Sequence, residues 1–315
     1  MSNTAWKSEP ASALPVRERG THAVSSLAWL LPYLFIAPTL VLILLIIAYP
    51  LGQAVYLSLT DMSFIKPVPT FVGLKNVTNV LSSSTFWLVF KNSLVWIISV
   101  VLFQFLIGLG TAILLNQKFV GRGVARALII IPWVTPGVIT GLLWRMMYEP
   151  QLGIINGILA ALQVPNPTIP WLTQGGTAML AVIISAIWKG SPFSTVMYLA
   201  ALQGVSTDLV DASKIDGANA WDRLRYVIIP QIAPVIRITV LLTTVWTANY
   251  FDIIYVMTEG GPLNKTHIFP TYVYELGFRA GKTGMASAVG LITAAVLLVF
   301  SLMYILELNR RKGLD

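Results

Sequence analysis

The sequence has no cysteine and very little charge. Only 11% of its 315 residues are Asp, Glu, Lys or Arg, against roughly 25% in soluble domains. Without cysteine there are no disulfides, no thiol nucleophile and no cysteine-ligated metal centre, and two histidines leave little for other metal sites. Hydrophobic residues make up 56% of the chain. A surface with so few charges does not suit water, so we expect most of it to face lipid.

The net charge of +8 does not indicate a nucleic-acid partner. The basic residues are spread thinly between apolar blocks and form no stripe that could follow a phosphate backbone. Their placement is instead informative about orientation in a membrane.

Charge-poor segments long enough to cross a bilayer recur along the chain. A spanning helix needs about 20 mostly apolar residues, and six segments meet this requirement, at 29–48, 86–115, 124–147, 177–202, 227–251 and 284–306. The first has no cleavage site after it and is too long for the core of a signal peptide, so it is kept as a helix. We therefore predict an all-α polytopic membrane protein with six transmembrane helices.

Six crossings put both termini on one side of the membrane, and lysine and arginine concentrate on the cytoplasmic side. Twelve basic residues flank the terminal side: Lys7, Arg17, Arg19, Lys118, Arg122, Arg126, Lys214, Arg223, Arg225, Arg310, Arg311 and Lys312. Five flank the other side: Lys66, Lys75, Lys265, Arg279 and Lys282. Both termini are therefore predicted to be cytoplasmic.

The expected organisation has three parts. Residues 1–27 are polar and are expected to form a disordered cytoplasmic tail. Residues 28–308 form the six-helix domain, and residues 309–315 form a second cytoplasmic tail. Within the domain, the cytoplasmic connection 204–226 is the one predicted to carry secondary structure of its own.

This connection reads as two short helices around a glycine. Thr207 is a candidate N-cap, and Leu209, Ala212 and Ile215 give the first helix an apolar edge. Gly217 permits a sharp turn before a second helix over 218–226. A helix–glycine–helix hairpin exposed to the cytoplasm is suited to fill a groove on a partner protein.

At these residues the chain resembles the integral-membrane permease subunits of ABC importers, whose cytoplasmic loop follows the pattern EAAxxxG, nine residues, then IxLP. The matching residues are Asp211, Ala212, Ser213, Asp216, Gly217, Ala218, Val227, Ile229, Pro230 and Pro234. Asp211 departs from the glutamate of the pattern and Ser213 from its second alanine. The resemblance implies that this loop couples the protein to a separate ATPase dimer. A plain acidic loop broken by glycine is the competing interpretation, and the spacing over 20 residues disfavours it.

Two further stretches resemble the sugar branch of these permeases, in the type that pairs with a second, different permease. Residues 246–266 end in TEGGPLNKT, similar to a GGPxxxT signature, and residues 187–193 read IWKGSPF, similar to WKxxPF. The resemblance implies half of a pathway for a sugar, a polyol or a glycerol-phosphate compound. It also implies an extracytoplasmic solute-binding protein and location in a bacterial inner membrane.

Four residues at the outer end of the fifth segment are candidates for the substrate pathway: Trp246, Asn249, Tyr250 and Asp252. Aromatic faces stack on sugar rings, while amides and carboxylates bind hydroxyl groups. The same residues are also typical of an aromatic belt at a membrane interface, which stays an open alternative.

Lys189 lies near the middle of the fourth segment, where a lysine is expensive, and must face protein or water. Gly190 and Pro192 beside it predict a broken helix. Lys189 is therefore a candidate pathway residue, with a structural role as the alternative, in which it bonds carbonyls that a kink sets free. Asn92 and Gln104 similarly either line the pathway or hold helices together, and we favour the second.

The stretch Gly277–Thr283 ends in GKT but has only three residues between its glycines, too few for a phosphate-binding loop. We therefore expect no cofactor and no enzymatic activity on this chain, with ATP and Mg²⁺ bound by the partner ATPase. A secondary transporter driven by an ion gradient is the alternative, although it would require intramembrane acids. An intramembrane hydrolase is disfavoured because His22 and His267 both lie outside the predicted spans.

Overall fold

The computed structural model describes residues 31–312. Helices account for 76% of the structure, and the described residues form no sheet, so the all-α prediction is confirmed. Five described helices are long and apolar enough to cross a membrane, and there are six crossings if one bent pair is a single span. The expected tail 1–27, with His22, lies outside the described residues.

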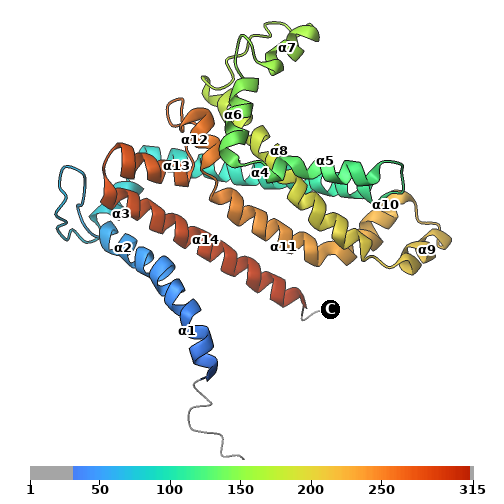
Figure 1. The fold of residues 1–315 in the computed structure, drawn as a ribbon, viewed down its shortest axis with the longest axis horizontal. Helices are drawn as coiled ribbons and strands as arrows, with labels where there is room; N and C mark the ends of the chain where they lie inside the picture. The colour runs from blue at the N-terminus through green and yellow to red at the C-terminus, as the bar shows by residue number, and fades with distance from the viewer. Residues whose placement is uncertain (1–30, 313–315) are drawn as a thin grey trace, which may run out of the picture. The chain divides into compact units, whose positions relative to one another are not determined.

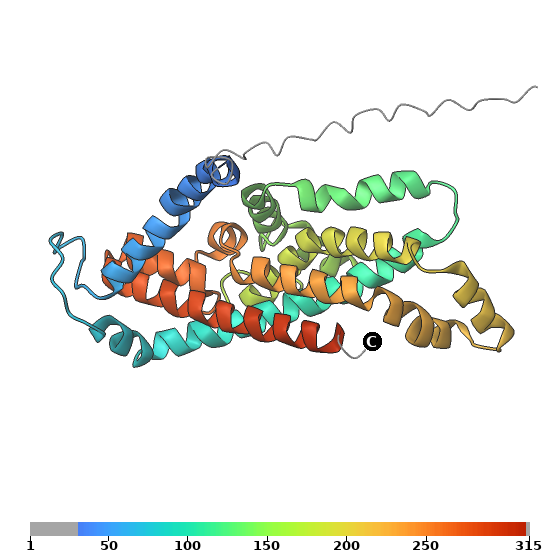
Figure 2. The ribbon, with the colours of Figure 1, turned by 90° about the horizontal axis from the view of Figure 1, so that it is seen from below.

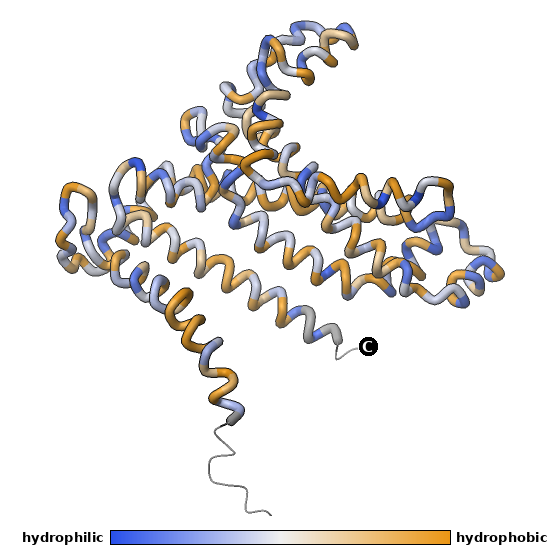
Figure 3. The backbone as a smooth tube through the Cα atoms, in the orientation of Figure 1, coloured by the Kyte–Doolittle hydropathy of each residue, from blue (hydrophilic) through white to orange (hydrophobic). Residues whose placement is uncertain are grey.

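The N-terminal unit, which ends at Leu51, contains α1 (Leu31–Ile43), the π-helical turn η1 (Leu44–Ala48) and the first residues of α2 (Tyr49–Ser58). Together they form an apolar helical span, Pro32–Ser58, whose most apolar window is entirely unburied by protein. Figure 3 shows the hydrophobic residues along α1. The first predicted span is confirmed and continues beyond residue 48.

The second unit, residues 52–315, contains the rest of the helices. They are α3 (Lys75–Leu81), α4 (Ser84–Asn116), α5 (Arg122–Val134), α6 (Gly137–Met147), α7 (Ile154–Ala161), α8 (Gly175–Gln203), α9 (Thr207–Ile215), α10 (Ala220–Asp222), η2 (Arg223–Ile228), α11 (Ile229–Ala248), α12 (Asp252–Thr258), α13 (Phe269–Tyr274), η3 (Glu275–Arg279) and α14 (Thr283–Lys312). The last helix takes in residues 309–312 of the expected C-terminal tail.

The long helices of this unit, α4, α5, α8, α11 and α14, run side by side, and α9 and α10 lie at one end of the bundle (Figures 1 and 2). The most extensive packing is between α4 and α8. These two helices approach closely at Gly108, where an added Cβ would lie 2.6 Å from Cβ of Ser194. Small residues at such a crossing let membrane helices pack backbone to backbone.

The third predicted span, 124–147, is not one straight helix. It consists of α5 and α6, which meet at an angle of 96°, and α6 is seen end-on in Figure 2. Thr135 between them is extended, with ψ of 128°, and Pro136 follows it. Proline offers no amide hydrogen and disfavours a helical conformation in the preceding residue, so the helix ends at Val134.

The predicted break in the fourth span is wrong, because α8 is continuous from Gly175 to Gln203 with Pro192 inside it. Gly190 serves a different purpose. A Cβ at this position would lie 2.0 Å from Nε2 of Gln104 on α4, and that amide donates a hydrogen bond to the carbonyl of Ala186, 3.2 Å away. The glycine therefore admits a neighbouring side chain.

Candidate functional site

The α9 helix ends in a turn that depends on Gly217. The amide of Gly217 donates to the carbonyl of Lys214 (3.1 Å) and the amide of Ala218 to that of Ser213 (2.9 Å). These are the two bonds of a Schellman motif, which needs a left-handed residue at its centre, and Gly217 has φ of +84°. The predicted turn is thus present. The predicted N-cap is off by one residue, since Ser206 precedes a helix that begins at Thr207.

The second helix of the hairpin starts later than predicted. Asn219 caps α10 by accepting hydrogen bonds from the amides of Trp221 (2.8 Å) and Asp222 (3.0 Å), and the Asp222 carboxylate accepts from the amide of Asn219 in return. Nη1 of Arg223 donates to the carbonyl of Ala218, 2.7 Å away. Two short helices are thereby tied together at the turn, which stiffens the hairpin.

The hairpin is continuous with a membrane helix. α10 passes into η2 and η2 into α11, so that Ala220–Ala248 forms one helical span of 29 residues. At 1.5 Å per residue, this span is about 43 Å long. One continuous helical span thus joins the hairpin to the end of α11 that carries Trp246.

Apolar side chains of the hairpin are exposed. No residue of α9, α10 or η2 is buried, and Ile215 is 88% exposed. Leu209, Trp221 and Tyr226 are exposed as well. The candidate coupling residue Asp211 forms an exposed ion pair with Lys214 at 2.7 Å within α9. We call the exposed side chains of Leu209, Ile215, Trp221 and Tyr226 the hairpin surface.

Lys189 on α8 lies at the break between α5 and α6. Its ammonium group donates to the carbonyl oxygens of Thr135 (2.5 Å) and Trp133 (3.4 Å). Carbonyls at the end of a helix have no partner within it, so Lys189 satisfies groups that the break sets free. The alternative structural role predicted for Lys189 was a bond of this kind, but the prediction placed the freed carbonyls at a kink in α8, whereas they lie at the end of α5.

Asp252 lies at the same break. Its carboxylate occupies the space beside Gly137, where an added Cβ would be 1.4 Å from Oδ2. Gly137 is the first residue of α6, and the N-terminus of a helix favours a negative charge. Asp252 also attracts Lys189 electrostatically. The structure thus brings two of the predicted pathway residues together as a clamp on the bend.

The remaining predicted pathway residues are divided between surface and core. The ring of Trp246 is 4.7 Å from that of Phe193 and the side chain is 47% exposed. The Asn249 side chain is exposed and donates to the carbonyl of Val245 (2.8 Å). Tyr250 instead packs edge-on against Trp96, with ring centroids 6.0 Å apart. Only Trp246 and Asn249 of the four present an exposed surface.

Two polar residues of α4 hold helices and loops together. Besides the Gln104 bond described above, Nδ2 of Asn92 donates to the carbonyls of Asn264 (2.9 Å) and His267 (3.1 Å). Both amides are therefore bonded to backbone carbonyls, which agrees with the role favoured from the sequence.

The GGPLNKT stretch is a tightly packed loop between α12 and α13. The hydroxyl of Thr266 lies 2.7 Å from that of Thr258 and donates to the carbonyl of Gly261 at 2.7 Å. Gly260 rests on the His267 ring, 2.0 Å from where its Cβ would be. Burial lowers the pKa of His267 to about 4, and the charge of Arg279 adds to this.

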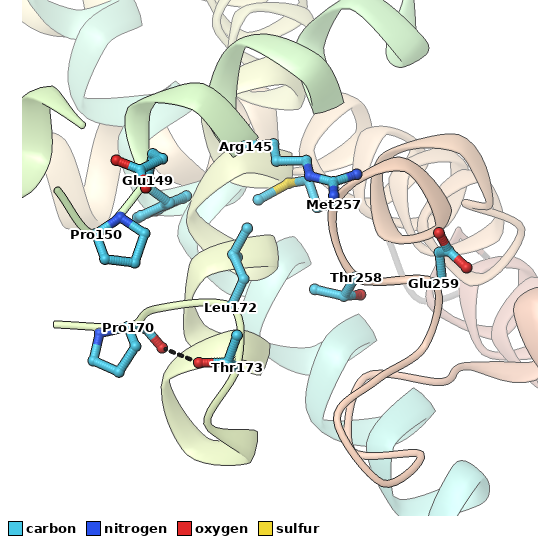
Figure 4. A pocket seen from close by; sticks show the side chains of 10 residues that line it. Arg145, Glu149, Pro150, Pro170, Leu172, Thr173, Met257, Thr258 and Glu259 are labelled. Carbon is cyan, nitrogen blue, oxygen red and sulfur yellow. Dashed lines mark hydrogen bonds between the residues drawn. The ribbon is translucent and has the colours of Figure 1, made fainter. Parts of the chain in front are cut away.

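A pocket that the sequence did not indicate lies at the C-terminal ends of α6 and α12 (Figure 4). It has a volume of about 370 Å³ and is lined by residues that include Arg145, Glu149, Leu172, Thr173, Met257 and Glu259. These residues come from three separate segments of chain, and only the one that contains Glu259 carries a motif, the TEGGPLNKT stretch. That motif does not indicate a pocket, and neither does Arg145 at the end of a predicted span.

Comparisons with known proteins agree with one another. Residues 104–312 match the family described as binding-protein-dependent transport system inner membrane component. A probable ABC transporter permease protein of Brucella suis is 35% identical over 87% of this chain and 95% of its own. The trehalose/maltose transport system permease protein MalF of Thermococcus litoralis is 36% identical over 87% of this chain and 92% of its own.

The trehalose transport system permease protein SugA of Mycobacterium tuberculosis is 31% identical over 87% of each chain. Among solved structures, a chain of a bacterial ABC transporter involved in the import of the acidic polysaccharide alginate superposes with a TM-score of 0.76. It covers 90% of this chain and 96% of that one at 24% identity, which shows a shared fold.

Proposed function

Because the chain belongs to the family of binding-protein-dependent transport system inner membrane components, we propose that it is a permease subunit of an ATP-driven carbohydrate importer. The hairpin surface is the observation that carries the proposal. Apolar side chains that are exposed together on a hairpin held by its own hydrogen bonds indicate a partner that covers them. A cytoplasmic ATPase with a matching groove is such a partner, and it binds the ATP and Mg²⁺ that drive transport.

Transport is driven through the hairpin. Closure of the ATPase dimer moves α9 and α10, and the continuous helix carries that movement to Trp246 and Asn249. Asp211, Ala212 and Ser213 on α9, with Asp216, Gly217 and Ala218 in the turn, form the part that meets the ATPase. The clamp of Lys189 and Asp252 keeps the α5–α6 bend in place while α11 moves.

The proposed cargo is a sugar or a related polyol or glycerol-phosphate compound. Two relatives more than 30% identical are named for the transport of trehalose or of trehalose and maltose. Trp246 and Asn249 offer an aromatic face and a hydrogen-bonding amide at the outer end of α11, which suits a hydroxylated ring. A second, different permease supplies the other half of the pathway, and an extracytoplasmic binding protein delivers the solute.

The proposed location is a bacterial inner membrane with both termini in the cytoplasm. The twelve basic residues on the side of the hairpin, against five on the other, support this orientation. In addition, α14 runs toward the end of the bundle that carries the hairpin (Figure 1). A common side for hairpin and C-terminus is what an ATPase-coupled permease requires.

A secondary active transporter is the less favoured alternative. Such a protein needs an acidic side chain at membrane depth to bind the coupling ion. Asp252 is the candidate, but its carboxylate lies against Gly137 and attracts Lys189. A carboxylate packed against a helix N-terminus and close enough to a lysine to attract it is poorly suited to bind a second cation.

Co-purification tests the proposal. The tagged protein, expressed with its neighbouring genes and extracted in mild detergent, is expected to bring down one chain of a second permease and two chains of an ATPase per tagged chain. The control is a variant with Ile215 and Trp221 both changed to Asp, which should lose the ATPase and keep the second permease. A protein that purifies alone, and whose uptake follows an ion gradient without ATP, would contradict the proposal.

A further inference from the structure

The pocket at the C-terminal ends of α6 and α12 is separate from the surface formed by Trp246 and Asn249, since it shares no residue with it. Its volume of about 370 Å³ falls within the range of small-molecule sites, about 300–1,000 Å³. Figure 4 shows charged and hydroxyl side chains arranged around it. Glu149, Leu172 and Glu259 of its lining lie in connections that are predicted to face the side opposite the hairpin, where the solute arrives under the proposed function.

The two carboxylates at the rim are held in position by other groups. Glu259 forms an ion pair with Arg279. Glu149 accepts hydrogen bonds from the amides of Gln151 (2.8 Å) and Leu152 (2.5 Å). Each carboxylate can accept further hydrogen bonds, so both present fixed acceptors to a ligand with hydroxyl groups.

Arg145 supplies the donors. Its guanidinium makes one hydrogen bond, to the carbonyl of Val256 at 3.2 Å, and it takes part in none of the ion pairs among the described residues. A guanidinium has five N–H groups. Several donors on an exposed side chain therefore remain for acceptors of a ligand.

Part of the lining of the pocket is apolar. Leu172 and Met257 lie among the charged side chains, and Pro150 and Pro170 lie together on one side (Figure 4). A pyranose ring requires apolar side chains that cover its C–H groups, together with donors and acceptors held in place for its hydroxyl groups. The lining carries one guanidinium, of Arg145, and two carboxylates, of Glu149 and Glu259, and this excess of negative charge disfavours an acidic ligand.

We propose that this pocket is a second carbohydrate-binding site, which receives one neutral sugar ring on the outer face before the sugar reaches Trp246. Arg145 donates to ring or hydroxyl oxygens, Glu149 and Glu259 accept from hydroxyl groups, and Leu172 packs against the C–H face. The inference rests on the proposed function, because it takes the cargo to be a carbohydrate.

Equilibrium binding tests the site directly. The importer assembled with its partner subunits in nanodiscs, without ATP, is titrated with radiolabelled maltose and trehalose. Arg145→Met and Glu259→Gln are each expected to weaken binding of the preferred sugar about tenfold, the effect of losing a charged hydrogen bond. Leu172→Trp, which fills the pocket without removing a charge, should remove one of the two classes of binding site and leave the binding that depends on Trp246. Lys265→Gln, an exposed charge outside the lining, is the matched control and should bind as wild type.

Three outcomes would overturn the proposal. If both charge variants and Leu172→Trp bind sugar with unchanged affinity, the pocket is not a sugar site. The proposed function then still stands, provided that Trp246→Ala abolishes sugar binding. Loss of binding-protein capture in these variants at unchanged sugar affinity would make the pocket a docking surface for that protein. Tighter binding of glucuronate than of glucose would contradict a neutral ligand. A wild-type importer that neither binds nor takes up any sugar would instead refute the proposed function.

Discussion

The ammonium group of Lys189 donates a hydrogen bond to the carbonyl oxygen of Thr135, 2.5 Å away, where α5 ends and α6 turns by 96°. This carbonyl has no helical partner because α5 ends at Val134 and Thr135, which precedes Pro136, is extended. A lysine from α8 thus replaces the missing amide, and Asp252 places a carboxylate beside it. The bend of α5 and α6 is held by side chains from two other helices.

Removal of the Lys189 ammonium should destabilise the protein. Lys189→Met leaves the carbonyls of Thr135 and Trp133 without their donor and removes the charge that attracts Asp252. An unsatisfied polar group away from water costs about 1–3 kcal/mol. We expect a lower melting temperature in detergent, measured by intrinsic fluorescence. Lys189→Arg retains the positive charge and the hydrogen-bond donors, so its melting temperature should fall less than that of Lys189→Met. Equal melting temperatures for wild type and Lys189→Met would show that the clamp does not hold the bend.

The turn at Gly217 should tolerate no proline. A left-handed φ of +84° is excluded for proline and disfavoured by roughly 1–2 kcal/mol for alanine. Gly217→Pro should insert normally yet recover no ATPase in a pull-down, and Gly217→Ala should recover less than wild type. Gly204→Ala is the control, because Gly204 has a negative φ of −88°. Full ATPase recovery with Gly217→Pro would refute a coupling role for the hairpin.

Trp246 and Asn249 should matter for uptake but not for assembly. Both side chains are exposed at the C-terminal end of α11, so alanine at either position removes a proposed sugar contact and disturbs little of the protein's packing. We expect impaired uptake of radiolabelled sugar with a normal yield of the complex. Phe103→Ala is the control, since Phe103 on α4 is also 47% exposed. Normal uptake kinetics in both variants would favour the alternative interpretation, in which these residues belong to an aromatic belt at the membrane interface.

Stability should fall as the pH is lowered from about 6.5 toward 4. Burial lowers the pKa of His267 to about 4, below its ordinary value of 6.5. In that interval the unfolded chain binds a proton that the folded chain does not, which favours unfolding, and above 6.5 the penalty vanishes. The melting temperature of wild type should therefore fall more between pH 7 and 5 than that of His267→Gln. Parallel pH profiles for the two proteins would contradict a buried, neutral His267.

The six apolar segments and the hairpin were predictable because their signals are local. Hydropathy over about 20 residues identifies a span, and the spacing around Gly217 identifies a turn. The bend in the third span was missed although Pro132 and Pro136 lie within it, since the apolar run was given more weight than the prolines. In α8 the opposite error occurred, because Gly190 and Pro192 were read as a break in a helix that packing against α4 keeps intact.

The contacts between distant segments could not be predicted from the sequence. Lys189 was expected to face protein or water, but its partner Thr135 lies 54 residues earlier, and no periodic pattern connects the two. The same holds for the pocket, where Arg145, Leu172 and Glu259 meet only in the folded chain. Sequence patterns identified the residues that membrane insertion makes costly, and tertiary packing decided what those residues bind.

Cysteine labelling of the hairpin tests most directly whether it faces the cytoplasm as the contact with an ATPase. The chain has no native cysteine, so Asp216→Cys provides a single target in the turn and Lys265→Cys a control on the opposite side. With a membrane-impermeant maleimide, Asp216→Cys should react in inside-out vesicles and not in intact cells, and an excess of ATPase should protect it. Labelling of Asp216→Cys from outside intact cells, or on neither side, would contradict the account.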